Sequence, residues 1–187
     1  MDDVTVYTPG NRFYDGLVAF LAAAASLSSE SRPLRLPCRD ENNPCLVLDP
    51  EEVLAPLRQN LWPEQIAFQR DAGAGEGFFG NPALTRVIES LLRAEFVSFY
   101  EAWAAPIVVA HGKNLRQWPP AWAFGRIVRN ALAHGGRFEI FSATDVSWRG
   151  RRFTDADHGR SFSSEDVRSG EFILLMADMD AALNLNP

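Results

Sequence analysis

The stretch from residue 81 to residue 110 contains the longest run of apolar residues at helical spacing in the chain. Its apolar side chains recur every three or four positions, so they form one broad helix face that other elements must cover. That face comprises Leu84, Val87, Ile88, Leu91, Leu92, Phe96 and Phe99. The pattern predicts a central helix from Pro82 to about Trp103, or to Ala110 with a kink at Pro106.

Three further segments have the same periodicity and predict amphipathic helices over residues 11–28, 119–134 and 171–184. A shorter helix is expected at residues 49–60, because it begins with the sequence Asp-Pro-Glu-Glu, which supplies a cap, a proline and acidic residues for the first turn. Another is expected at residues 63–70, after a proline. Helices therefore account for most of the regular structure that the sequence predicts.

Few segments have the alternation of apolar and polar residues that is typical of β-strands. Residues 138–141 and 146–148 alternate and predict a small hairpin, with a further arm at residues 151–153. Residues 29–48 and 71–80 are expected to be loops because they are rich in proline or glycine and in polar residues.

Four long amphipathic segments against so few strands predict an all-α fold, a helical bundle with a small β-hairpin before the C-terminal helix. Residues 1–9 are expected to be an irregular lead-in. With 187 residues the chain suits a single domain spanning residues 1–187.

Hydropathy and charge point to a cytoplasmic protein. No apolar run approaches the roughly 20 residues of a membrane span. The apolar stretch 17–27 is preceded by the acidic residues Asp2, Asp3 and Asp15, which is unlike a secretory signal. We therefore expect a cytoplasmic location and no contact with membranes.

The net charge of −6 argues against a protein that coats nucleic acid, but the charge is unevenly distributed. Residues 113–160 contain nine of the 18 basic residues and four of the 24 acidic ones, so this segment carries +5 and the rest carries −11. Such polarity would draw a phosphate-bearing ligand to the segment. The alternative is a GC-rich genome that encodes arginine throughout, because only Lys113 in this segment is a lysine.

The two cysteines, Cys38 and Cys45, predict no metal site. A structural zinc site needs four ligands, and no second pair of Cys or His residues is close in the sequence. A disulfide would be unusual in a reducing cytosol. We interpret the two cysteines as incidental thiols and expect no metal or other cofactor.

The helix predicted at residues 119–134 ends in a group of polar side chains. Arg126, Asn130 and His134 follow one another at four-residue spacing on one side of the helix, and Arg129 flanks them. Gly135-Gly136 then ends the helix. An arginine, an amide and an imidazole at one helix end can bind a phosphate and move a proton.

The sequence Arg129-Asn130-x3-His134 resembles the signature of the HEPN superfamily, small helical domains that include many RNA-cleaving toxins. The likeness extends over residues 80–182. Along this segment a helix with the signature is followed by Gly-Gly, by short strands with Val146-Ser-Trp-Arg-Gly150, and by a final apolar helix. It is similar to a plasmid- and defence-associated branch. The resemblance implies an all-helical fold, a homodimer with a composite active site at its interface, and metal-independent RNA cleavage. A toxin of this kind would pair with an antitoxin protein.

RNA cleavage of this kind needs only a base, an acid and charge stabilisation, because the ribose 2′-OH is the nucleophile. His134 is expected to transfer protons and Arg129 to stabilise the charge on the phosphate, while Asn130 orients the imidazole or binds the substrate. Arg126 and Arg137 are candidate phosphate contacts. The products would be a 2′,3′-cyclic phosphate and a 5′-OH.

A second match to the looser pattern, from Arg152 to His158, lies in a segment without helical periodicity. It contains Asp155 and Asp157, whose carboxylates would repel an RNA phosphate, so we expect it to play no part in catalysis. Two functions remain open. One is a metal-independent endoribonuclease of the toxin or defence type. The other is a catalytically inactive HEPN-like dimerisation module that binds RNA or a protein partner, as many members of that superfamily are inactive scaffolds.

Overall fold

The computed structural model of the chain contains two compact units. One comprises Met1–Glu95 with Arg168–Ile173, and the other comprises Phe96–Val167 with Leu174–Pro187. Helices α3 (Pro82–His111) and α5 (Ser169–Asn184) contribute residues to both units. The residues that the structure describes are 4–27, 33–38, 45–71, 82–141 and 144–184.

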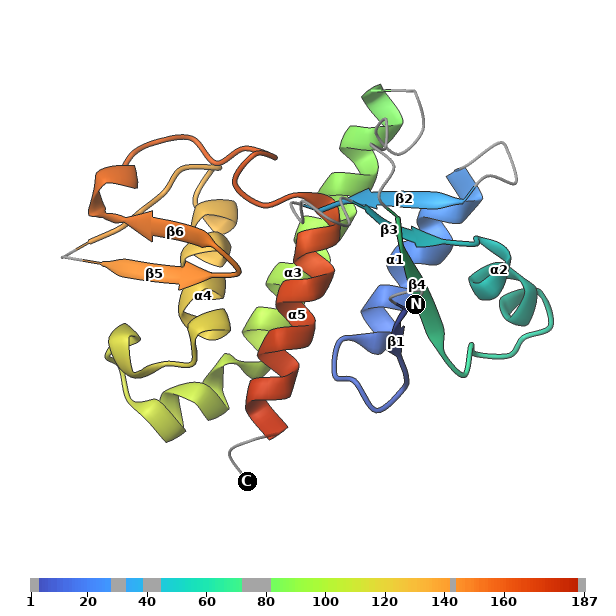
Figure 1. Ribbon diagram of the computed structural model, residues 1–187, viewed down its shortest axis with the longest axis horizontal. Helices are drawn as coiled ribbons and strands as arrows, with labels where there is room; N and C mark the ends of the chain where they lie inside the picture. Colours follow the sequence, from blue (N-terminus) through green and yellow to red (C-terminus); the bar gives the residue numbers. More distant parts are fainter. Residues whose placement is uncertain (1–3, 28–32, 39–44, 72–81, 142–143, 185–187) are drawn as a thin grey trace. The chain divides into compact units, whose positions relative to one another are not determined.

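The first unit contains a four-stranded antiparallel sheet in the order β1–β4–β3–β2 (Figure 1). Its strands are β1 (Val4–Tyr7), β2 (Leu34–Pro37), β3 (Cys45–Leu48) and β4 (Ile66–Asp71). This sheet overturns the prediction of an all-α helical bundle, because the described residues form a mixed α/β fold with five α-helices and six strands.

The strands replace three elements that the sequence analysis predicted wrongly. β1 lies in the expected irregular lead-in, β2 and β3 lie in the expected loop at 29–48, and β4 replaces the short helix expected at 63–70. In β4, Ile66 and Phe68 are buried and the intervening Ala67 is only partly buried, which is the period of a strand. The rest of the predicted loops at 29–48 and 71–80 falls mostly on residues 29–32, 39–44 and 72–80, which lie outside the described residues.

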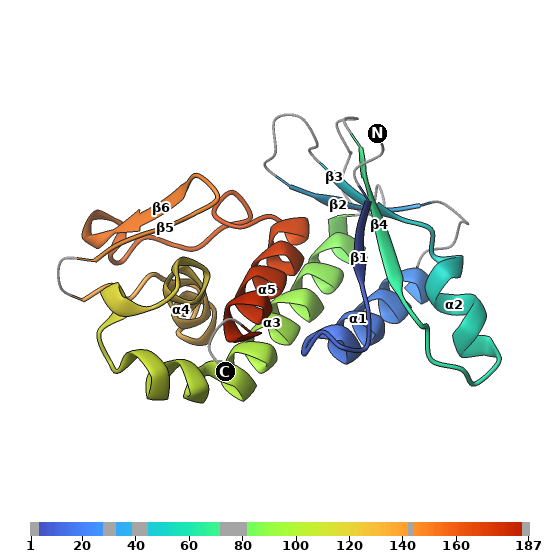
Figure 2. The ribbon, with the colours of Figure 1, turned by 60° about the horizontal axis from the view of Figure 1, so that its bottom comes forward.

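Two helices in the first unit confirm the predictions at residues 11–28 and 49–60. α1 (Tyr14–Leu27) lies against the sheet (Figure 2), and the Tyr14 hydroxyl donates to the carbonyl oxygen of Pro63 at 2.8 Å. α2 (Glu51–Arg58) begins where the Glu51 N–H donates to Asp49 Oδ1 at 3.0 Å. Both helices therefore begin where sequence periodicity and capping chemistry indicate, within three residues.

In the second unit, α4 (Pro120–Ala133) packs beside a hairpin of β5 (Asp145–Trp148) and β6 (Arg151–Thr154) (Figure 1). Arg149 and Gly150 connect the two strands with φ of 44° and 74°, the backbone conformation of a tight two-residue hairpin turn. The hairpin is confirmed, but its first arm is β5. Residues 138–141 form no strand, so the prediction that they pair within the hairpin is wrong.

Aromatic rings form the core between α4 and the hairpin. Phe153 stacks on Phe124 with ring centroids 4.7 Å apart, and it also contacts Phe138 at 4.7 Å. Two indole N–H groups tie these elements to α5: that of Trp122 donates to the Met179 carbonyl oxygen at 2.8 Å, and that of Trp148 to Asp178 at 2.7 Å. Trp122 and Trp148 therefore both pack in this core and hydrogen-bond to α5, which fixes the position of α4 in its unit.

Candidate functional site

Helix α4 ends at the predicted glycines. Its C-cap is His134, whose N–H donates to the Asn130 carbonyl oxygen at 3.0 Å. Gly135 and Gly136 follow with φ of +75°, and the Gly136 N–H donates to the Ala131 carbonyl oxygen at 2.9 Å. Because residues with a Cβ are strained at such φ values, the two glycines end the helix where the sequence predicts.

The structure brings Arg129 and Asn130 into direct contact. Arg129 Nη1 donates to Asn130 Oδ1 at 3.1 Å, and the same guanidinium forms an ion pair with the Glu101 carboxylate of α3. The Arg129 side chain is 27% exposed. The Glu101 carboxylate holds the guanidinium in one position, so Arg129 is not an uncommitted cation.

The predicted proton-transfer group, His134, lies at the end of the helix and is exposed. Its imidazole forms no hydrogen bond or ion pair with any described residue. It is therefore accessible to a ligand or to another protein chain, and no side chain fixes which ring nitrogen carries the proton.

Arg126 lies one turn before Asn130 and is held by an aromatic ring. Its guanidinium carbon is 5.1 Å from the centroid of Trp118, a cation–π contact. Trp118 is itself buried and anchored, because its indole N–H donates to the Gly112 carbonyl oxygen at 2.9 Å. Among the described residues Arg126 has no ion-pair partner. Its charge is available to a ligand.

Arg126 and Asn130 line a pocket of about 320 Å³ that we call the α4 pocket. Its walls come from the segment before α4, from one face of α4, and from two stretches before and at the start of β5. The lining residues are Lys113, Asn114, Leu115, Arg116, Arg126, Ile127, Asn130, Glu139, Ile140, Phe141, Thr144, Asp145 and Val146. Its volume lies at the lower end of the range for ligand sites.

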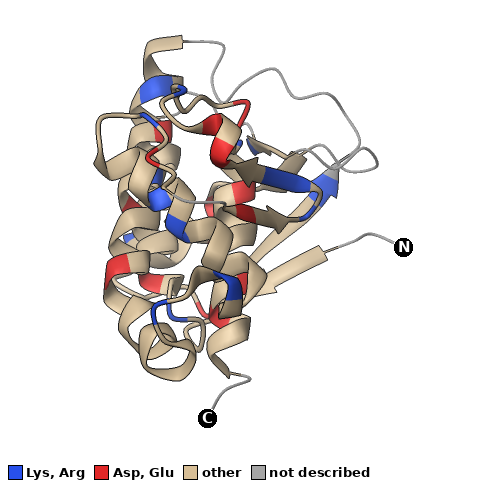
Figure 3. Cartoon of the chain, turned by 90° about the vertical axis from the view of Figure 1, so that its left-hand side faces the viewer, with Lys and Arg blue, Asp and Glu red and all other residues tan. Residues whose placement is uncertain are grey.

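Three cations and two carboxylates line the α4 pocket. Lys113, Arg116 and Arg126 carry the positive charge. Asp145 is paired with Arg152, from β6, through two contacts of 2.7 Å, and the hydrogen bond from Arg152 is the largest cause that lowers the pKa of the Asp145 carboxyl. On the side of the cartoon that Figure 3 shows, the positions of basic and acidic residues are interspersed. The lining residues therefore carry a small excess of positive charge.

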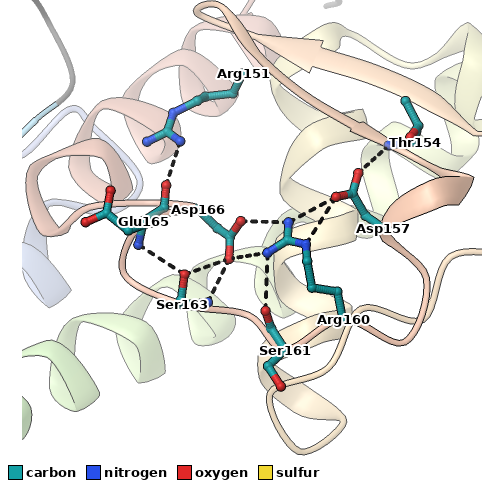
Figure 4. A network of polar contacts seen from close by, with 8 residues as sticks. All are labelled: Arg151, Thr154, Asp157, Arg160, Ser161, Ser163, Glu165 and Asp166. Carbon is teal, nitrogen blue, oxygen red and sulfur yellow. Dashed lines mark hydrogen bonds and ion pairs between the residues drawn. The ribbon is translucent and has the colours of Figure 1, made fainter.

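A compact network of polar contacts holds the segment that follows β6 (Figure 4). The Arg160 guanidinium lies between Asp157 and Asp166, with N···O distances of 3.1 Å and 2.8 Å. Asp166 also accepts the Ser163 N–H at 2.7 Å. Arg160 in turn covers the ring of Phe138 at 4.6 Å, so the network supports the segment that contributes Glu139, Ile140 and Phe141 to the pocket.

Of the predicted site residues only Arg126 and Asn130 line the α4 pocket, whereas Arg129, His134 and Arg137 lie outside its lining. Arg137 is exposed and donates to the Gly159 carbonyl oxygen at 3.2 Å. In the second sequence match, Arg152 pairs with Asp145, and His158 Nδ1 accepts the Ile140 N–H at 3.2 Å. Both members of that match therefore have structural contacts.

Sequence reasoning predicted only Arg126 and Asn130 among the residues that line the pocket, and those it missed include Lys113, Arg116, Glu139 and Phe141. Two signals pointed toward them. Lys113 and Arg116 belong to the basic segment, and the alternation of residues 137–141 predicts that Glu139 and Phe141 share one side of an extended chain. No sequence pattern indicates that this segment faces α4.

Metal ligands do not gather in the part of the chain that the structure describes: no three His, Cys, Asp or Glu side chains there are placed to hold an ion. Cys38 and Cys45 are buried free thiols, and burial, reinforced by the nearby Glu171, raises the pKa of the Cys38 thiol to about 12. Among the described helices none has both the length and the apolar character needed to cross a bilayer.

No protein-family model matches the chain, and no curated protein or solved structure is significantly similar to it.

Proposed function

We propose that this chain binds single-stranded RNA at the α4 pocket and cleaves it without a metal ion. The observation that carries the proposal is Arg126, which lines the pocket, is held over Trp118 and has no ion-pair partner among the described residues. Lys113 lines the same pocket. Arginine and lysine side chains bind phosphate oxygens through charge-assisted hydrogen bonds. We further propose that this activity is cytoplasmic.

The proposed cleavage uses the ribose 2′-OH as nucleophile. A base removes its proton, the oxygen attacks the adjacent phosphorus, and the 5′-oxygen leaves with a proton from an acid, which gives a 2′,3′-cyclic phosphate and a 5′-OH. His134 transfers protons, since its imidazole is exposed and uncommitted among the described residues. Arg129 and Asn130 stabilise the charge that develops on the phosphate.

One imidazole does not easily serve as both base and acid, so we propose a homodimer in which His134 of one copy lies near Arg129 or His134 of the other. The resemblance of residues 80–182 to the HEPN superfamily supports this arrangement. The four-stranded sheet is built from residues 4–71 and lies outside that segment.

One observation favours a second function, an RNA-binding module without cleavage. Arg129 is already paired with Glu101, so the phosphate of a bound RNA would have to compete with a carboxylate for the guanidinium. The second function predicts that RNA binds at the α4 pocket and stays intact.

Binding is tested with a single-stranded 2′-O-methyl oligonucleotide of mixed sequence, which lacks the nucleophile, by fluorescence anisotropy in EDTA. We expect Arg126→Gln to weaken binding about tenfold and to reduce the slope of log affinity against log salt by about 1. Arg58→Gln removes an equal charge at an exposed position and is expected to leave affinity unchanged. Equal affinities for wild type and Arg126→Gln would contradict the proposal.

A further inference from the structure

The segment after α4 contributes Glu139, Ile140 and Phe141 to the α4 pocket, and Glu139 and Phe141 are its exposed residues there. Along residues 137–141 exposure alternates: Phe138 and Ile140 are buried, whereas Glu139 and Phe141 are exposed. Because successive side chains of an extended chain point to opposite sides, Glu139 and Phe141 share one side. Both line the pocket.

This segment has a fixed backbone. The Phe138 N–H donates to the Arg160 carbonyl oxygen at 2.9 Å, and the Phe138 carbonyl oxygen accepts the Gly159 N–H at 2.8 Å. The Ile140 N–H donates to His158 Nδ1 at 3.2 Å. Glu139 and Phe141 are therefore carried by a wall whose backbone is already hydrogen-bonded, and such preorganisation lowers the entropic cost of binding.

Glu139 is the unexplained charge in this pocket. Its carboxylate is exposed and forms no hydrogen bond or ion pair with any described residue, whereas the other carboxylate of the pocket, that of Asp145, is paired with Arg152. An uncommitted carboxylate repels phosphate, so it does not help the cations to bind a nucleic-acid backbone. It can accept hydrogen bonds from two adjacent N–H groups at once.

We propose that the α4 pocket selects guanine, with Glu139 accepting hydrogen bonds from guanine N1–H and N2–H and with Phe141 stacking on the base. This inference rests on the proposed binding of RNA. Among the four RNA bases only guanine has two neighbouring donors on its Watson–Crick edge. Adenine and cytosine offer one amino group beside an acceptor, and uracil offers one N–H between two acceptors, so each would turn an acceptor toward the carboxylate.

Phe141 supplies the stacking surface. Its side chain is 71% exposed, and its ring contacts that of His158 with centroids 5.4 Å apart. An exposed aromatic ring on the wall of a cationic pocket offers a face on which any base can stack. Phe141 therefore contributes affinity for all bases, and Glu139 contributes the discrimination between them.

The test compares 2′-O-methyl oligouridines that carry one guanine, inosine, adenine or cytosine, with anisotropy measured in EDTA. We expect the guanine oligonucleotide to bind about tenfold more tightly than the adenine one, the usual discrimination of a two-pronged base contact. Inosine lacks the N2 amino group and is expected to lose most of that advantage. Glu139→Gln is expected to remove the preference for guanine while adenine binding stays the same or strengthens.

Two variants separate the contributions. Phe141→Ala is expected to weaken binding of all four oligonucleotides about equally. Glu64→Gln makes the same change at an exposed position outside the pocket and is expected to retain the preference for guanine. Equal binding of all four oligonucleotides by the wild type, or a guanine preference that survives Glu139→Gln, would overturn the inference about guanine. The proposed RNA binding would still stand if Arg126→Gln weakens the affinity for these oligonucleotides. Failure of the wild type to bind any oligonucleotide would overturn both proposals.

Discussion

The Arg129 guanidinium is ion-paired with the Glu101 carboxylate, which joins helix α4 to α3. The Glu101 side chain is 51% exposed. The pair therefore holds Arg129 in place and also competes with any phosphate for its charge. Because neither side chain of the pair is fully buried, removing the Glu101 carboxylate does not leave a buried, unpaired charge. The competition can therefore be measured in a protein that stays folded.

Glu101→Gln is expected to strengthen binding of the 2′-O-methyl oligonucleotide about threefold, the effect of one partly exposed charge pair. The free energy of unfolding should change by less than about 1 kcal/mol. Anisotropy and urea denaturation give the two values, with Glu64→Gln as the charge-matched control. Weaker binding by Glu101→Gln would show that the carboxylate positions Arg129 for the ligand rather than competing with it.

The Asp166 carboxyl predicts a pH-dependent part of the stability. Burial raises its pKa, but the hydrogen bonds from Arg160 and from Ser163 outweigh burial and hold the pKa below its usual value of 3.8. A carboxyl with a lowered folded-state pKa stabilises the fold above its unfolded pKa, and this contribution is lost as the pH falls through the folded pKa.

Asp166→Asn is therefore expected to lower the free energy of unfolding by about 2 kcal/mol at pH 7, the cost of losing hydrogen bonds to a charged group. The difference from wild type should shrink as the pH falls below about 4. Denaturation by urea at several pH values measures both. The control is Asp155→Asn, at an exposed carboxylate nearby. A difference that is constant with pH would contradict the assignment of this contribution to the Asp166 charge.

Gly170 allows a close approach between α5 and β2. A Cβ on this residue would lie 2.8 Å from the Leu36 carbonyl oxygen and 2.4 Å from Cys38 Sγ. Gly170→Ala is expected to lower the free energy of unfolding by about 2 kcal/mol, because overpacking forces the backbone to shift. In a Cys38→Ala background the loss should be smaller, since only the contacts with the Leu36 and Pro37 carbonyl oxygens remain. Gly10→Ala, whose Cβ would meet Thr8 at an ordinary 3.6 Å, is the control.

The helices could be predicted from the sequence because each carries its own signal. Helix α3 is long enough for apolar residues to recur over several turns, and α2 follows Asp49, whose carboxylate accepts the Glu51 N–H. The end of α4 could be placed because Gly135 and Gly136 are chemically suited to the φ values found there.

The sheet could not be predicted, because its signal does not lie within any one segment. β2 and β3 are four residues long, and they pair, with Leu36 opposite Leu46, in a segment whose sequence is typical of a loop. Strands this short are stabilised by their partners and by burial rather than by local propensity. The same reason applies to the site. Arg126 and Asn130 are neighbours on one helix and could be grouped from spacing, whereas Glu139 reaches the pocket only through tertiary contacts.

The central claim is tested most directly by incubating the purified protein with single-stranded RNA in EDTA and identifying the product ends. We predict 2′,3′-cyclic phosphate and 5′-OH ends from the wild type. Cleavage should be lost in His134→Ala and largely lost in Arg129→Lys, because a point charge replaces a two-pronged contact. His158→Ala, in the other sequence match, should still cleave. RNA that is bound but stays intact under these conditions, or cleavage that persists in His134→Ala, would contradict the account.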